Sequence, residues 1–227
     1  MYIDVIASSS KGNSYLISDG KTAILIECGL SMNELKKRTN FVVPRRIDGC
    51  LVTHSHQDHS KALKDMLNLG VDCYALKETF EANGIAHHRA YFIEDKKEIK
   101  IGTFKIIPLE MYHDVPCIGF LVYSKMTNEK LLFATDTYMI KYAINGLDYI
   151  MIEANYDVEL VADNGQRERL IKSHMSIETT IEYLKSIDLS NVKQIYLMHL
   201  SSRHSNEEEF KRKVQAATGV PIVVCKE

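Results

Sequence analysis

Four side chains of the kinds that bind metal ions in proteins lie close together between Thr53 and Ser60. They are His54, His56, Asp58 and His59. Neutral imidazoles and a carboxylate form the mixed nitrogen and oxygen set that suits zinc, and also manganese or iron. A lone histidine usually has a structural role, but three histidines and an aspartate interleaved this closely indicate a metal site.

The flanking residues predict a strand before these ligands and a helix after them. Residues 49–53 are largely apolar and predict a buried strand. Because extended residues two apart share a face, the side chains of His54 and His56 should point to the same side at the end of that strand. Residues 61–69 carry apolar side chains at helical spacing, and Gly70 after them favours the end of a helix. We therefore expect the ligands at a junction between a strand and a helix.

Three later residues of the same types each follow an apolar segment that predicts a strand. They are His113, Asp136 and His199, after residues 104–109, 131–134 and 195–198. Strand ends that project into one crevice are a common way for sheet proteins to assemble a site. Taken singly, each residue also fits a hydrogen-bonded structural role or a helix cap. Together with the first four they supply enough ligands for two adjacent metal ions that share a carboxylate.

Length, composition and charge are those of an ordinary globular protein. The chain has 227 residues, of which 45% are hydrophobic and 26% charged, which allows one large domain with a sizeable core. A net charge of -2 argues against a surface built to coat nucleic acid. No apolar run approaches the ~20 residues of a membrane span and no signal peptide is visible, so we expect no membrane contact. Five cysteines without CxxC spacing favour buried, reduced thiols and a cytoplasmic location.

The order of the predicted elements indicates an α/β fold. Short apolar strands come in two series along the chain, and each series is followed by helices. This order predicts two packed sheets with helices outside them. No repeat, linker or change of composition divides the chain, and we expect one hydrolase domain over residues 1–227.

The spacing His54-x-His56-x-Asp58-His59, followed in order by His113, Asp136 and His199, resembles the metallo-β-lactamase superfamily. The resemblance spans nearly the whole chain. It implies a four-layer αββα sandwich and two divalent metal ions, zinc or alternatively manganese. It also implies how the ligands divide: His54, His56 and His113 for one ion, Asp58, His59 and His199 for the other, and Asp136 bridging them.

One position departs from the superfamily pattern. Where the superfamily usually has Asp-x-Gly after a strand, this chain has Glu27-Cys28-Gly29. The resemblance implies that the residue at that position contacts the metal ligands without binding the metal itself. We expect Glu27 to have the same role with altered geometry.

Two further segments resemble the tRNase Z-like phosphodiesterase branch of the superfamily. Ile152-Glu153-Ala154-Asn155 is similar to its His-Glu-Ala-Thr segment, and Ser173-His174-Met175-Ser176 to its His-Ser-Thr segment. The resemblance implies that His174 protonates the leaving oxygen and that Glu153 orients it, which suits the expulsion of an alkoxide from phosphate. We count Asp58 with this pair as a catalytic residue, besides its place among the metal ligands. The alternative is a helix-capping histidine beside an unrelated buried glutamate.

Within that branch the chain looks closest to single-domain YycJ-like DNA exonucleases and to their phage-encoded relatives. The latter include the anti-Pycsar enzymes, which hydrolyse cyclic nucleotide signals as homodimers. Residues 7–14 and 197–201 carry this similarity. The chain has no inserted arm for tRNA, no tryptophan, and no stacking platform of aromatic residues interleaved with Lys and Arg. A polymeric substrate should require some of these features.

We therefore predict a phosphodiesterase with two metal ions that hydrolyses a cyclic mononucleotide. It would act as a homodimer in the cytoplasm, the host's if the chain is phage-encoded. A 5′–3′ DNA exonuclease is the alternative, with nucleic acid as its partner. A thioester or lactone hydrolase on the same metals is a second alternative, and a metal-bearing protein that only sequesters nucleotides is a third. The charged segment 156–169 is expected to be a substrate lid, a dimer contact or a plain surface loop.

Overall fold

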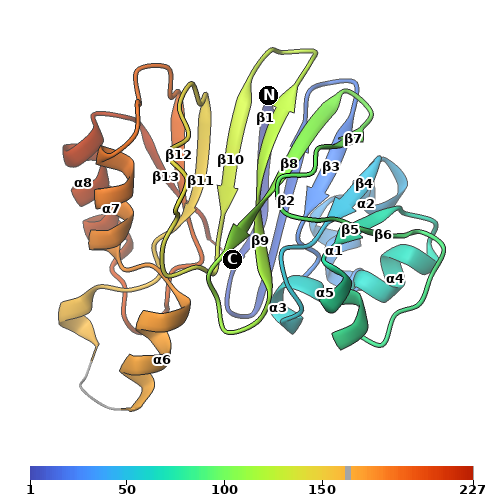
Figure 1. The fold of residues 1–227 in the computed structure, drawn as a ribbon, viewed down its shortest axis with the longest axis horizontal. Helices are drawn as coiled ribbons and strands as arrows, with labels where there is room; N and C mark the ends of the chain where they lie inside the picture. Colours follow the sequence, from blue (N-terminus) through green and yellow to red (C-terminus); the bar gives the residue numbers. More distant parts are fainter. Residues whose placement is uncertain (162–164, 227) are drawn as a thin grey trace.

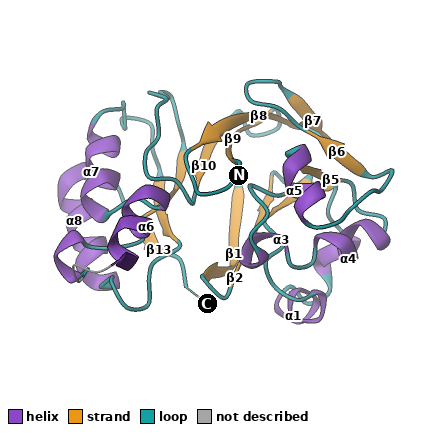
Figure 2. Ribbon diagram, turned by 60° about the horizontal axis from the view of Figure 1, so that its bottom comes forward, coloured by secondary structure: helices purple, strands orange, loops and turns teal. Residues whose placement is uncertain are grey.

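Two β-sheets pack face to face at the centre of the molecule, with helices on the outer face of each (Figure 1). The structure, a computed structural model, describes residues 1–161 and 165–226. Within those residues, one sheet has the strand order β1-β2-β3-β4-β5-β6 and the other the order β13-β12-β11-β10-β9-β8-β7. Figure 2 shows the strands in the middle and the helices on both flanks. The αββα sandwich predicted from the sequence is confirmed.

Each sheet is built from one continuous half of the chain. The first contains β1 (Tyr2–Ser9), β2 (Gly12–Ser18), β3 (Ala23–Ile26), β4 (Gly49–Leu51), β5 (Cys73–Ala75) and β6 (Ala90–Phe92). The second contains β7 (Ile99–Ile101), β8 (Phe104–Met111), β9 (Cys117–Ser124), β10 (Lys130–Ala134), β11 (Tyr149–Glu153), β12 (Gln194–Met198) and β13 (Ile222–Val224). The helices of the first half are α1 (Met32–Arg38), α2 (Val42–Arg45), α3 (Gln57–Ser60), α4 (Leu63–Asn68) and α5 (Lys77–Ala82). Those of the second half are the 3-10 turn η1 (Val158–Leu160), α6 (Gly165–Ser173), α7 (Ile177–Lys185) and α8 (Glu207–Thr218).

Alternating side chains along the strands create the layers. In β10, Leu131 and Phe133 pack between the two sheets, while Leu132 and Ala134 belong to the apolar cluster under α7 and α8. Successive residues of a strand point to opposite faces, so a strand that is apolar throughout must be covered on both sides. A second sheet covers one side here and helices cover the other.

The helix predicted over residues 61–69 is α4, which begins two residues later and ends one residue earlier. A separate short helix, α3, precedes it and carries Asp58 and His59. The two helices are distinct because the N–H of Ala62 donates to the carbonyl of Cys28 at 2.9 Å instead of continuing α3. This bond joins the end of α3 to the segment that follows β3.

Gly29 lies where this segment meets α3, and no side chain fits there. A Cβ atom at Gly29 would lie 1.6 Å from the carbonyl oxygen of Asp58. We expect Gly29→Ala to lower the free energy of unfolding by about 3 kcal/mol or more, measured by chemical denaturation. Gly20→Ala is the control, because its surroundings are open and only its left-handed φ of 89° costs about 1 kcal/mol. A loss no larger than that of the control would contradict the close contact.

Two expectations from the composition concern membranes and thiols. Among residues 1–161 and 165–226, no helix combines the length and apolar character that crossing a membrane requires. In the same described part of the chain all five cysteines are buried and form no disulfide, as predicted. Cys50 and Cys73 are register partners on β4 and β5, where they act as small apolar residues of the core.

Candidate metal centre

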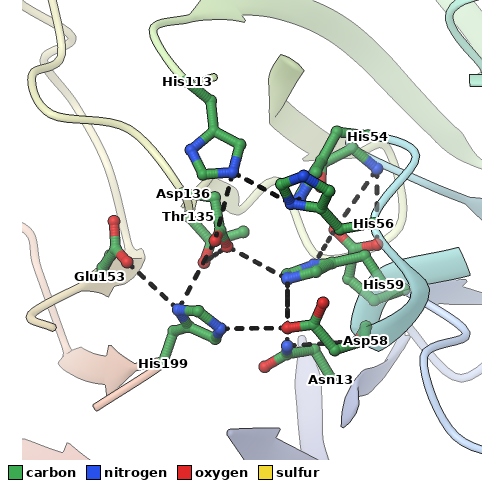
Figure 3. Close-up of polar contacts among 12 residues, drawn as sticks. Asn13, His54, His56, Asp58, His59, His113, Thr135, Asp136, Glu153 and His199 are labelled. Carbon is green, nitrogen blue, oxygen red and sulfur yellow. Dashed lines mark hydrogen bonds and ion pairs between the residues drawn. The ribbon is translucent and has the colours of Figure 1, made fainter. Parts of the chain in front are cut away.

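The seven predicted metal ligands converge at one edge of the two sheets (Figure 3). His54 and His56 follow β4, Asp58 and His59 lie in α3, and His113, Asp136 and His199 follow β8, β10 and β12. β8, β10 and β12 run in the same direction, so their carboxyl-terminal ends reach the same edge. The structure therefore brings every predicted ligand together, and the assignment of each to a particular metal ion stays a prediction.

One group consists of His54, His56 and His113, whose ligand nitrogens lie within 4.8 Å of one another. His56 Nδ1 is 3.1 Å from His54 Nε2 and 3.3 Å from His113 Nε2. The outer nitrogens have partners of their own: Thr53 Oγ1 lies 2.8 Å from His54 Nδ1, and the carbonyl of Ser173 lies 2.9 Å from His113 Nδ1. Such partners determine which nitrogen of each ring faces the site.

A second group consists of Asp58, His59 and His199, again with ligand atoms within 4.8 Å of one another. Asp58 Oδ2 is 3.4 Å from His59 Nε2 and 3.4 Å from His199 Nε2. The Asp136 carboxylate lies between the two groups, with Oδ2 3.2 Å from His59 Nε2 and Oδ1 3.9 Å from His113 Nε2. Figure 3 shows this central position, which suits a carboxylate shared by two ions.

The electrostatics of these groups favour a bound cation. Burial opposes the charging of His59, but Asp136 and Glu27 raise its pKa well above the ordinary value. Burial also opposes the charging of His199, and Asp136 and Asp58 raise its pKa to about 10. The carboxylates around His59 and His199 thus stabilise positive charge in the space between the ligand side chains. A divalent ion supplies that charge and uses nitrogen and oxygen donors, so these residues fit a divalent metal.

Three residues around the site have left-handed backbone conformations. The φ angles are 66° at Glu27, 51° at Asp136 and 52° at His199. Side chains other than glycine adopt this region rarely, at a cost of about 1 kcal/mol or more. Local contacts maintain it, as at His199, whose carbonyl accepts from the Asn155 amide at 2.8 Å and whose N–H donates to Ser8 Oγ at 3.0 Å. Strain of this kind is typical of functional sites.

Glu27 is fully buried next to His59 of the second group. This position suits the supporting role that we expected for it in place of the usual aspartate. Its Oε1 lies 3.4 Å from His59 Nδ1 and 3.3 Å from the backbone nitrogen of Thr53. Among the described residues His59 Nδ1 makes no hydrogen bond of good geometry, so the Glu27 carboxylate is the group placed to hold it.

We expect Glu27→Gln to weaken metal binding by about 10- to 100-fold, as is usual when the partner of a ligating histidine is changed. A competition titration with a chelating dye would measure the affinity. Glu34→Gln on the exposed face of α1 is the matched control, because Glu34 pairs with Arg38 at the surface. An unchanged affinity in Glu27→Gln would mean that the carboxylate does not support His59.

Two residues near the ligands were not predicted as part of the site. Asn13 Nδ2 lies 3.1 Å from His59 Nε2, and Asp114 Oδ1 lies 3.1 Å from His113 Nε2 and 3.4 Å from His56 Nε2. Asn13 lies at the start of β2, in a stretch rich in small residues, and Asp114 directly follows a predicted ligand. Those two positions are the only hints that the sequence gives of their place in the site.

His174 and Glu153, the predicted proton donor and its partner, are hydrogen-bonded beside the ligands. His174 Nδ1 lies 2.6 Å from Glu153 Oε1, and its ring stacks on His199 with 5.5 Å between centroids. Burial lowers the pKa of His174, but the Glu153 carboxylate outweighs it and raises the pKa above the ordinary value. Ser176, not His174, caps α7. The glutamate is therefore not unrelated to the histidine, and the role of His174 as a proton donor stays a prediction.

These two residues also form, with Asp136 and His199, a set whose ligand atoms lie within 4.8 Å of one another. Within that set, His174 Nδ1 and Glu153 Oε1 are bonded to each other. Glu153 Oε2 accepts from the backbone nitrogens of Thr137 and Met175 at 3.2 and 3.3 Å. Glu153 Oε1 also lies 3.2 Å from His199 Nδ1, so Glu153 contacts both histidines and the pair adjoins the second ligand group.

Comparison with known proteins identifies the family. Residues 22–200 match a family model described as the β-lactamase superfamily domain. The chain belongs to the metallo-β-lactamase superfamily. It is 29% identical over 227 residues to exodeoxyribonuclease WalJ of Streptococcus pneumoniae, covering 90% of this chain and 83% of that protein. It is 27% identical over 229 residues to exodeoxyribonuclease YycJ of Bacillus anthracis, covering 92% and 85%.

A solved structure agrees with this membership. The metallo-β-lactamase fold protein YhfI from Bacillus subtilis superposes with a TM-score of 0.78 at 16% identity, over 99% of this chain and 96% of that one. As a member of the superfamily's phosphodiesterase branch the protein is a metal-dependent hydrolase. The predicted family, fold and enzyme class are confirmed.

Proposed function

We propose that the protein hydrolyses a phosphodiester bond of a nucleotide and that its substrate is a cyclic mononucleotide. The observation that carries the proposal is the hydrogen-bonded pair of His174 and Glu153 beside the metal ligands. A positioned proton donor assists the departure of an alkoxide from phosphorus. Thioester or lactone hydrolysis on the same metals would not need that pair. The net charge of -2 supports a small substrate over a polymer.

The two metal ions of the proposed enzyme are zinc, with manganese as the alternative, because the donors are imidazoles and carboxylates. One would be held by His54, His56 and His113, the other by Asp58, His59 and His199, with Asp136 shared. When bound, the ions supply Lewis acidity that activates water and offsets negative charge on the phosphate.

The chain's own residues act on the leaving group. Glu153 holds His174 through Nδ1 at 2.6 Å, so Nε2 is the nitrogen that delivers a proton to the departing ribose oxygen. The two backbone N–H groups that bind the other oxygen of Glu153 keep the carboxylate ionised and in place, because hydrogen bonds to the charged form favour it. The imidazolium form of His174 is in turn favoured by that carboxylate.

A 5′–3′ DNA exonuclease is the second candidate. It is supported by the names of the two relatives, which are exodeoxyribonucleases at 27–29% identity. Both candidates use the same chemistry at phosphorus and differ only in what binds the rest of the substrate.

The test is hydrolysis of 3′,5′-cyclic mononucleotides and of 5′-phosphorylated single- and double-stranded DNA at matched zinc or manganese. We expect the cyclic nucleotides to give linear monophosphates and a chelator to stop the reaction. Product from DNA alone would replace the cyclic nucleotide by DNA as the substrate. Product only from a thioester or lactone would overturn the phosphodiesterase proposal itself.

We also propose that two copies of the chain associate through the region of η1 and α6. Val158, Leu160 and Ile171 expose 38%, 50% and 45% of their surfaces there, and exposed apolar side chains often mark contact surfaces. The predicted lid or dimer segment 156–169 lies in this region, but residues 162–164 are outside the described residues. Sedimentation velocity of the wild type and of Leu160→Asp tests the proposal, and identical monomeric profiles would contradict it.

A further inference from the structure

Tyr112 and Tyr138 form an aromatic pair beside the metal ligands that the proposed mechanism does not use. Their ring centroids are 5.4 Å apart, and the ring planes are inclined by 34°. Tyr112 directly precedes His113, and Tyr138 follows two residues after Asp136. The two loops that supply these ligands therefore also supply the aromatic pair.

Backbone contacts place the pair on one side of the site. The N–H of Tyr138 donates to the carbonyl of Tyr112 at 3.0 Å, and the N–H of Tyr112 donates to Thr137 Oγ1 at 2.9 Å. The N–H of Thr137 donates in turn to Glu153 Oε2 at 3.2 Å, and Glu153 holds His174. The tyrosines are thus connected to the part of the site where the proposed mechanism releases the ribose oxygen.

The surroundings of the pair suit a nucleobase. Tyr138 is 40% exposed, so its ring is accessible to a ligand. Lys141 Nζ lies 5.1 Å from the ring centroid of Tyr112 and pairs with Glu110, which fixes Tyr112 from one side. Aromatic rings combined with a nearby cation are the surfaces on which proteins stack bases without regard to sequence.

The sequence shows no run of aromatic residues interleaved with Lys and Arg, but the structure brings together tyrosines from the loops after β8 and β10, with a lysine beside Tyr112. The pair is formed by the fold and has no local sequence signature, because long-range hydrogen bonds join the two loops.

We infer that the base of the substrate stacks on Tyr138, with Tyr112 completing the surface, an inference that rests on the proposed nucleotide phosphodiesterase function. We place the ribose of such a base toward His174, because hydrogen bonds through Thr137 and Glu153 join the loops of the two tyrosines to His174. Tyr138 determines the binding of the base and does not contact the reacting atoms. Either a cyclic nucleotide or the terminal nucleotide of a DNA strand has such a base.

The test compares a ligand that has a base with one that lacks it. Adenosine 5′-monophosphate and ribose 5-phosphate are the probes, and isothermal titration of the zinc-loaded protein measures their affinities. We expect Tyr138→Leu to weaken binding of the monophosphate about ten-fold or more, as the loss of one stacked base does, while ribose 5-phosphate binds as before. Tyr138→Phe keeps the ring and should bind as the wild type does.

Tyr2→Leu is the matched control, because Tyr2 is also an exposed tyrosine. It lies at the first residue of β1, whereas the turn between β1 and β2, at the other end of the strand, is the part near the site. Equal weakening of both probes in Tyr138→Leu, or no weakening of either, overturns the inference. When a cyclic nucleotide is the substrate, Tyr138→Leu should raise KM more than it lowers kcat. Because binding is measured without turnover, base-dependent binding by a protein that cleaves no phosphodiester overturns the proposed function and leaves the stacking surface in place.

Discussion

Replacing Asp136 with alanine is expected to lower turnover by at least about 10³-fold, more than the loss of one transition-state donor usually costs. The side chain is buried, and its oxygens lie 3.2 Å from His59 Nε2 and 3.6 Å from His199 Nδ1. Removing the carboxylate takes away the charge that both rings face, so the metal should be lost together with the activity. Metal content after dialysis, measured by mass spectrometry, and the hydrolysis rate are the two readouts.

Asp136→Asn separates charge from shape, because it keeps the size of the side chain and removes its charge. We expect it to lose most of its metal while its circular dichroism spectrum matches that of the wild type. Asp188→Asn is the control, since the Asp188 carboxylate lies at the surface, where it accepts a hydrogen bond from the Ser190 N–H. Full metal content and full rate in Asp136→Ala would show that the carboxylate is not shared between the two ligand groups.

The second large effect is expected from His174→Gln, which should lower kcat by about 10²- to 10⁴-fold while the metal content stays unchanged. Glutamine can still bond to Glu153 but cannot deliver a proton. The defect should depend on the leaving group, because a p-nitrophenolate departs without protonation whereas a ribose alkoxide does not. A p-nitrophenyl ester of thymidine 5′-phosphate should therefore be hydrolysed at nearly the wild-type rate.

The same variant also tests the other possible role of this histidine. His174 belongs to a set of ligand atoms with Asp136, Glu153 and His199, so a loss of metal in His174→Gln would make it a ligand and not a proton donor. An equal loss of rate on both leaving groups would point in the same direction. His88→Ala is the control, because His88 is exposed, stacks on His87 in a loop before β6 and belongs to none of the ligand groups.

The sequence predicted the convergence of the candidate ligand side chains because apolar runs end where strands end. His113, Asp136 and His199 each follow such a run, and parallel strands bring those ends to one edge. The convergence of His54 and His56 was predicted correctly for an incomplete reason. β4 ends at Leu51, so the two rings meet through the loop after the strand and not through strand alternation.

Contacts between distant backbones could not be predicted in the same way. The bond from Ala62 to Cys28 separates α3 from α4, and nothing near residue 62 indicates it. The approach of Asn13 to His59 and the pairing of Tyr112 with Tyr138 likewise depend on segments that meet only in the folded chain. If the tyrosine pair binds a base as proposed, the low net charge is the remaining reason for preferring a small substrate.

The construction of each sheet from one half of the chain has an engineering consequence. β6 ends at Phe92 and β7 begins at Ile99, and the connection between them carries the exposed Lys96 and Lys97. A chain cut there would give two fragments, each with a whole sheet and an apolar face that the other covers. One fragment would carry four of the ligands and the other three. Hydrolysis would then require both the reassembly of the two fragments and the presence of the metal ions. The rate of hydrolysis would therefore report on the two conditions together.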